Sequence, residues 1–166
     1  MSLARDLLRA NARHVAAFDA SGLQVRPRRA LAILTCMDSR YTAQGVLGLA
    51  LGDAHVIRNA GGRVTEDVIR SLTLSAALLG TRACVVIHHS DCGLVGRSDE
   101  ELQQRVVAAA GARPPFSFLP FDDLEQSVRD DVQALRACTY FPPDYEVIGF
   151  IYDVLTGQLL QVDDSP

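Results

Sequence analysis

Short apolar runs alternate with longer amphipathic segments along the chain. The runs at 30–34 and 83–88 have the length of strands, and the second contains Val85, Val86 and Ile87 in succession. A shorter segment at 54–58 is also predicted as a strand. Continuously apolar strands are typical of parallel sheets that are covered on both faces. The pattern therefore predicts a mainly parallel β-sheet.

Helical segments separate these strands. Thr65 is a predicted N-cap, Glu66 and Asp67 suit the first turn of the helix that follows, and Gly80 suits its end. A shorter helix is expected to end at Gly52. The predicted helices are an N-terminal amphipathic helix at 2–19 and further helices at 43–51, 64–79, 98–110 and 122–137. Ser98 is the predicted N-cap of the helix at 98–110.

The C-terminal part has the pattern of a hairpin. A strand at 145–154, a tight turn at 156–157 and a returning strand at 158–162 follow the last predicted helix. The fold class is therefore α/β: a mainly parallel sheet flanked by helices, with a C-terminal antiparallel hairpin and an N-terminal amphipathic helix. A length of 166 residues fits a single domain spanning 1–166.

Composition narrows the classes of function. Apolar residues make up 48% of the chain, which argues against intrinsic disorder. The chain has 16 basic and 20 acidic residues and no strongly basic face, so no nucleic-acid partner is expected. No apolar stretch reaches the length of a membrane span, and no signal peptide is visible. We therefore expect a cytoplasmic protein without a membrane partner, whose cysteines are thiols or metal ligands.

Three residues of metal-ligand type lie at the ends of two predicted strands. His89 and Cys92 are three positions apart, which suits two ligands from one turn, and Cys36 follows the strand at 30–34. In doubly wound sheets, sites gather at the carboxyl ends of the strands. A catalytic zinc takes three protein ligands and keeps one position open. Cys36, His89 and Cys92 are therefore the predicted ligands of Zn²⁺, one per chain.

Three motifs, in this order and spacing, resemble the β-class carbonic anhydrases. They are Cys36–Arg40, the Arg58-Asn59-Ala60-Gly61 run and His89–Gly93, and the likeness returns at Gly149–Val154. The resemblance implies a zinc held by two cysteines and one histidine, with an Asp–Arg dyad beside it. By position, Asp38 and Arg40 are the expected catalytic pair.

The resemblance also implies the activity. The expected reaction is the zinc-dependent reversible hydration of carbon dioxide to bicarbonate by a zinc-bound hydroxide, which the dyad orients. In that arrangement Arg40 spreads the charge of Asp38 and leaves it as an oriented acceptor. Two alternatives stay open: hydrolysis of carbonyl sulfide or carbon disulfide at the same zinc, and a non-catalytic zinc-binding protein on this fold.

Other chemistry-bearing residues have simpler interpretations. Cys84 and Cys138 are expected to behave as small apolar residues. The side chain of His88 is expected to face away from that of His89, because successive residues of a strand point to opposite faces. His55 is read as mainly structural. Asp91 is left open between a role in holding the site and simple solvation.

Family resemblance extends to assembly and control. It implies a homodimer or a multiple of dimers, with the N-terminal helix and the aromatic loop at 116–121 as candidate contact surfaces. Some family members are switched by bicarbonate bound in a pocket formed by a Val, an Arg and a Tyr. The matching positions here are Tyr41, Arg58 and Leu74, so only the Arg is kept. We expect no such switch, with Asp38 held by Arg40 and off the metal near neutral pH.

Overall fold

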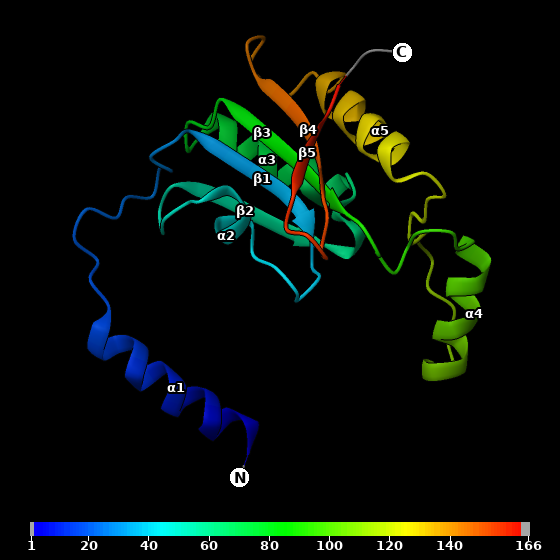
Figure 1. Ribbon diagram of the computed structural model, residues 1–166, viewed down its shortest axis with the longest axis horizontal. Coiled ribbons are helices and arrows are strands. Elements are labelled where there is room, and N and C mark those ends of the chain that lie inside the picture. Colours follow the sequence, from blue (N-terminus) through cyan, green and yellow to red (C-terminus); the bar gives the residue numbers. More distant parts are fainter. Residues whose placement is uncertain (1, 164–166) are drawn as a thin grey trace.

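A five-stranded sheet with strand order β2-β1-β3-β4-β5 organises the chain in this computed structural model, which describes residues 2–163 (Figure 1). The strands are β1 (Leu31–Cys36), β2 (Ala54–Asn59), β3 (Ala83–His89), β4 (Glu146–Tyr152) and β5 (Leu159–Val162). The helices are α1 (Leu3–Ala17), α2 (Ala43–Leu47), α3 (Glu66–Ala77), α4 (Asp99–Ala110) and α5 (Leu124–Arg136), with a 3-10 turn η1 (Ala60–Gly62). Residues 1 and 164–166 of the expected single domain lie outside the described residues.

Strand directions agree with the predicted fold class. β1 runs parallel to both β2 and β3, and β3 runs parallel to β4. Only the final pair, β4 and β5, is antiparallel among the strands described. The mainly parallel sheet with a C-terminal hairpin is thus confirmed. The carboxyl ends of β1, β2 and β3 consequently lie along one edge of the sheet.

Two apolar clusters cover the two faces of the sheet. On one face, side chains of β1 and β3 such as Leu34 and Val86 pack against Leu72 of α3 and Leu135 of α5. On the other face, Ile33 and its neighbours pack against α2 and the C-terminal hairpin. β1 and β3 are therefore buried on both sides, as their continuous apolar runs predicted.

Helix α2 differs from its prediction. It ends at Leu47, because Gly48 adopts a left-handed conformation (φ +62°) and caps it. Gly52, the predicted end, also has a positive φ (+84°) but lies in the turn that precedes β2. Both glycines adopt a left-handed conformation of the kind that ends a helix, and the earlier one ends α2.

The remaining helices match their predictions to within two residues at each end. The N-caps expected at Thr65 and Ser98 both accept a hydrogen bond from the backbone N–H three residues on. α1 lies away from the sheet, and none of its described residues is buried (Figure 1). Within residues 2–163 no helix combines the length and apolar composition that crossing a membrane requires.

Candidate metal centre

Cys36, His89 and Cys92 come together at the carboxyl edge of the sheet. Cys36 is the last residue of β1 and His89 the last residue of β3, while Cys92 lies in the turn that follows. The ligand atoms of the three side chains all lie within 4.8 Å of one another, and all three residues are buried. Among the described residues this is the one group of side chains gathered in a way that could hold a metal ion. The parallel pairing of β1 with β3 is what brings 36 and 89 to the same edge.

The ring of His89 is oriented toward the two sulfurs. Its Nδ1 donates to the carbonyl oxygen of Ser90 at 2.8 Å, which fixes the ring and leaves Nε2 as the free nitrogen. Nε2 is buried and has no hydrogen-bond partner. A buried polar atom without a partner carries a desolvation penalty that a bound cation would remove. This nitrogen and the two thiols therefore form a donor set that fits zinc.

The two cysteines share a proton unequally. The pKa of Cys36 lies well below its usual value, chiefly because the Cys92 thiol donates to its sulfur, although burial opposes the shift. The pKa of Cys92 moves in the opposite direction for the same reason. The Cys92 thiol therefore favours the thiolate form of Cys36, and a bound cation would favour the loss of the remaining proton.

The loop that carries Cys36 is held by the neighbouring strand. Arg58 of β2 donates from Nε to the carbonyl oxygen of Cys36 at 2.9 Å, and its terminal nitrogen donates to the carbonyl oxygen of Asp38. Gly62 packs directly beneath this strand end: a Cβ there would lie 3.0 Å from the backbone nitrogen of Cys36. The Arg58–Gly62 segment therefore contacts the backbone on both sides of Cys36.

Asp38 and Arg40 form a close ion pair beside the cluster. Arg40 donates from Nε to both carboxylate oxygens of Asp38, at 3.0 and 3.1 Å, and from Nη2 to Oδ2 at 2.8 Å. These hydrogen bonds lower the pKa of Asp38 to about 2, so the group is ionised at neutral pH. Oδ2 of Asp38 lies 3.9 Å from Nε2 of His89, which places the carboxylate next to the cluster.

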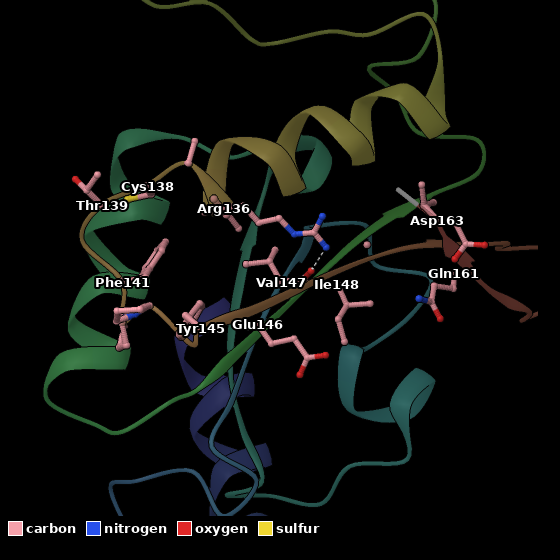
Figure 2. A pocket seen from close by; sticks show the side chains of 16 residues that line it. Arg136, Cys138, Thr139, Phe141, Tyr145, Glu146, Val147, Ile148, Gln161 and Asp163 are labelled. Atoms are coloured by element: carbon pink, nitrogen blue, oxygen red, sulfur yellow. Dashed lines mark hydrogen bonds between the residues drawn. The ribbon is translucent and has the colours of Figure 1, made fainter. Parts of the chain in front are cut away.

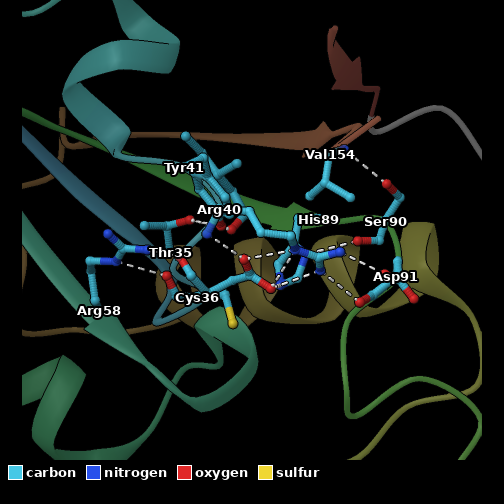
Figure 3. A network of polar contacts seen from close by, with 11 residues as sticks. Thr35, Cys36, Arg40, Tyr41, Arg58, His89, Ser90, Asp91 and Val154 are labelled. Atoms are coloured by element: carbon cyan, nitrogen blue, oxygen red, sulfur yellow. Dashed lines mark hydrogen bonds and ion pairs between the residues drawn. The ribbon is translucent and has the colours of Figure 1, made fainter. Parts of the chain in front are cut away.

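Asp91 is a site residue that the sequence left undecided. Its carboxylate accepts from Nη1 of Arg40 at 2.6 Å, and its carbonyl oxygen accepts from Nη2 at 3.0 Å. Arg40 therefore contacts acidic residues on two loops, the one after β1 and the one after β3 (Figure 3). The sequence signal for a role of Asp91 was its position between two expected ligands. Its partner Arg40 is 51 residues away, so the contact itself had no local signal.

A cavity of about 450 Å³ opens over the cluster. The expected ligands and Asp38 line it together with Met37, Ala60, Gly61 and Leu94 among others. The apolar members of this wall suit a small uncharged molecule better than a charged one.

A larger cavity of about 690 Å³ lies elsewhere, between the end of α5 and the beginning of β4 (Figure 2). Arg136 extends along it and donates to the carbonyl oxygen of Val147 at 2.7 Å. Since β4 is parallel to β3, its amino-terminal end lies at the opposite edge from the metal cluster. This cavity is therefore separate from the candidate site.

The other residues singled out in the sequence have structural surroundings. His88 points to the face opposite His89, as predicted, and shares a hydrogen bond of 2.8 Å with Ser127 of α5. His55 shares one of 2.8 Å with Ser75 of α3. Cys84 is fully buried in the core, and Cys138 is partly exposed after α5.

Comparison with known proteins decides the family. The carbonic anhydrase family model matches residues 31–111. β-Carbonic anhydrase 1 of Mycobacterium tuberculosis is 36% identical over 162 residues, which cover 98% of this chain and 99% of that protein. This chain belongs to the β-carbonic anhydrase family. The members are zinc enzymes, in agreement with the Cys36–His89–Cys92 cluster.

Two further relatives frame the function of this β-carbonic anhydrase homologue. A carbonic anhydrase structure from Streptococcus mutans superposes with a TM-score of 0.92, at 43% identity, covering 98% of this chain and 99% of that one. A carbon disulfide hydrolase of Saccharolobus solfataricus is 47% identical over 157 residues, covering 79% of this chain and 76% of that protein. The family therefore includes relatives named for two different substrates.

Proposed function

We propose that this chain hydrates carbon dioxide reversibly to bicarbonate, with Cys36, His89 and Cys92 as zinc ligands and Asp38 and Arg40 as catalytic residues. The observation that carries the proposal is the joint geometry: three ligand atoms within 4.8 Å of one another, beside an ionised carboxylate held by Arg40. A purely structural zinc site would not need such a carboxylate, so the non-catalytic alternative is disfavoured.

The chain's own residues have distinct tasks in this proposal. When bound, zinc makes water a nucleophile near neutral pH, an effect for which carbonic anhydrases are the standard example. Asp38 is ionised and therefore only accepts hydrogen bonds, so it orients a water molecule at the cluster through that molecule's proton. Arg40 holds Asp38 in the orientation that this requires. The apolar wall around Met37 and Leu94 admits carbon dioxide.

The test combines zinc content with carbon dioxide hydration measured by stopped flow. Cys36→Ser should lose zinc and activity together, whereas Cys138→Ser, a change at a cysteine outside the cluster, should lose neither. Asp38→Asn should keep zinc but lose about 10²-fold or more in kcat, a typical loss for a group that acts in proton transfer or orientation. Full activity in Asp38→Asn, or full zinc retention in Cys36→Ser, would contradict the assignment.

Hydrolysis of carbon disulfide at the same site is the second candidate. It is favoured by the relative of Saccharolobus solfataricus, which is named for that reaction. The same zinc-loaded preparation should be assayed with carbon dioxide, carbonyl sulfide and carbon disulfide. A larger kcat/KM for a sulfur substrate than for carbon dioxide would reverse the order of the two proposals.

We further propose that bicarbonate does not switch this enzyme. The ring of Tyr41 is almost fully buried, its hydroxyl bonds to Thr35 at 2.8 Å, and Arg58 lies over it at 5.4 Å. Arg58 already donates to two backbone carbonyl groups, and Leu74 carries no hydrogen-bonding side chain. A crystal structure of the zinc-loaded protein at about pH 7.5, soaked with bicarbonate, tests this. Bicarbonate beside Arg58, or Asp38 on the metal with Arg40 unpaired, would contradict it.

Assembly as a homodimer or a multiple of dimers is the corresponding proposal for quaternary structure. α1 and the residue after it present large apolar side chains that remain 48–75% exposed in the single chain: Leu3, Leu7, Leu8, Val15 and Phe18. Exposed apolar surface of this extent is typical of contact surfaces between chains. Sedimentation equilibrium should give at least twice the chain mass, and Leu7→Glu should shift the equilibrium toward the monomer. A monomeric wild-type protein would contradict this.

A cytoplasmic location is proposed on the chemistry of the cysteines. The described cysteines are all free, and the proposed function needs two of them reduced. Reduced thiols persist in the cytosol, where disulfides are rare. Cell fractionation with an antibody to the chain would test this, and recovery from an oxidising compartment would contradict it.

A further inference from the structure

Arg40 links the loop after β1 to the loop after β3. Its Nε and Nη2 donate to Asp38, and its Nη1 and Nη2 donate to the carboxylate and the carbonyl oxygen of Asp91 (Figure 3). The guanidinium group is planar and its donors have fixed directions, so contacts on both edges restrict its rotation. We call this arrangement the Asp38–Arg40–Asp91 bridge.

The backbone of Asp91 makes the second half of the bridge possible. Asp91 has φ +54°, in the left-handed region that few residues other than Gly, Asn and Asp tolerate. In this conformation its carbonyl oxygen and its carboxylate both face the same guanidinium group. The residue lies between His89 and Cys92, so the bridge is attached directly to the turn that carries two expected ligands.

We propose that Asp91 is a positioning residue, which fixes Arg40 so that Arg40 in turn fixes the carboxylate of Asp38; this rests on the proposed function. With Asp91 in place, Arg40 is held at both ends and Asp38 is held relative to the β3 loop. Without the Asp91 carboxylate, Arg40 keeps Asp38 but can turn with it, since 41% of its side chain is exposed. The fraction of molecules with a productively oriented Asp38 would then fall.

The exposure of Asp91 predicts which measurements detect the loss of its carboxylate. Its side chain is 76% exposed, and ion pairs this exposed contribute little to folding stability. An effect on stability or zinc content is therefore not expected. An effect on turnover is, because small displacements of an orienting group lower the rate of the chemical step.

The matched experiment compares Asp91→Asn with Asp67→Asn. Asn keeps the size and the tolerance for a left-handed backbone but removes the charge. Asp67 forms an equally short ion pair with Arg70, at 2.6 Å and with 72% exposure, on α3 away from the candidate site. Asp91→Asn should lower kcat for carbon dioxide about two- to fivefold, with KM and zinc content unchanged. A loss of this size corresponds to the upper part of the free-energy range of an exposed ion pair. Asp67→Asn should leave kcat unchanged.

A double-mutant cycle with Arg40→Ala tests whether Asp91 acts through Arg40. Once Arg40 is absent, Asp91→Asn should cause no further loss of kcat. An equal loss in both backgrounds, or loss of zinc from Asp91→Asn, would overturn the proposal.

A second measurement does not depend on activity. The Nη1–H protons of Arg40, which donate to the Asp91 carboxylate, should exchange slowly with solvent in ¹⁵N NMR spectra of the wild-type protein and faster in Asp91→Asn, but unchanged in Asp67→Asn. Unchanged exchange in Asp91→Asn would overturn the bridge. An inactive wild-type protein with the expected exchange pattern would instead refute the proposed function and leave the bridge supported.

Discussion

Gly62 offers a sensitive test of how closely the loop after β2 packs against the candidate metal site. The residue has φ +72°, and a Cβ added there would lie 3.0 Å from the nitrogen of Cys36, 3.0 Å from the carbonyl carbon of Thr35 and 3.2 Å from the oxygen of Ile87. All three are backbone atoms of β1 and β3, so no side-chain rotation can relieve the contact. Gly62→Ala must therefore separate this loop from the ends of those strands.

Gly111→Ala is the matched control. Gly111 has nearly the same φ (+76°), but a Cβ there would meet no atom within 4 Å. It should cost only the left-handed backbone strain, about 1–2 kcal/mol. Gly62→Ala should introduce the same backbone strain and, in addition, an overpacking energy of about 1–3 kcal/mol. The free energy of unfolding should thus fall about twice as far, and zinc retention should fall with it because Cys36 is displaced.

The assay is urea unfolding followed by far-UV circular dichroism, since the chain contains no Trp for fluorescence. Zinc and protein concentrations are held constant, because binding and association shift apparent stability. Zinc retention is measured in parallel by dialysis against a chelator. If Gly62→Ala lowers the stability no more than Gly111→Ala does and keeps its zinc, the close packing of Gly62 against the end of β1 is refuted.

Two further predictions concern buried groups. Burial raises the pKa of Cys84 to about 12, so a thiol reagent at pH 8 should label the partly exposed Cys138 and leave Cys84 unmodified, as peptide mapping would reveal; labelling of Cys84 in the native protein would contradict its burial. Asp131 accepts from Nε of Arg63 at 2.8 Å and lies 3.1 Å from Nε2 of the fully buried His88. Asp131→Asn should therefore lower the free energy of unfolding by about 3 kcal/mol, the range for breaking a buried ion pair, and a loss below 1 kcal/mol in urea unfolding would count against that pairing.

The fold was predictable because each element carries its own local pattern. Residues 31–34 of β1 and 83–87 of β3 are apolar without interruption, and the residues that cap α3 and α4 occupy their expected positions. The predicted end of α2 was wrong because Gly48 and Gly52 are equally able to end a helix. Which of two such glycines is used depends on how the following turn packs, and the local sequence does not contain that information.

The candidate site likewise has features that the local sequence predicts and features that it does not. The convergence of Cys36, His89 and Cys92 was predictable because parallel strands place their carboxyl ends at one edge. The partner of Asp91 was not, because it depends on the distance between two loops that are 51 residues apart in sequence. The sequence predicted which face of the sheet the side chain of His88 occupies. It did not predict the contact with Ser127, because α5 packs on the sheet only in the folded chain.

The loop after β1 is held from both neighbouring strands, and the two attachments act on different parts of it. On the β2 side, Arg58 donates to the backbone carbonyl groups of Cys36 and Asp38, so it fixes the course of the chain. On the β3 side, Arg40 binds the carboxylate of Asp38 and connects it to Asp91, so it fixes a side chain. The backbone contacts of Arg58 set where Cys36 lies for a metal, whereas Arg40 sets where the carboxylate of Asp38 points. On the proposed function, we therefore expect changes at Arg40 to alter turnover without removing the metal, because Arg58 holds the backbone of Cys36.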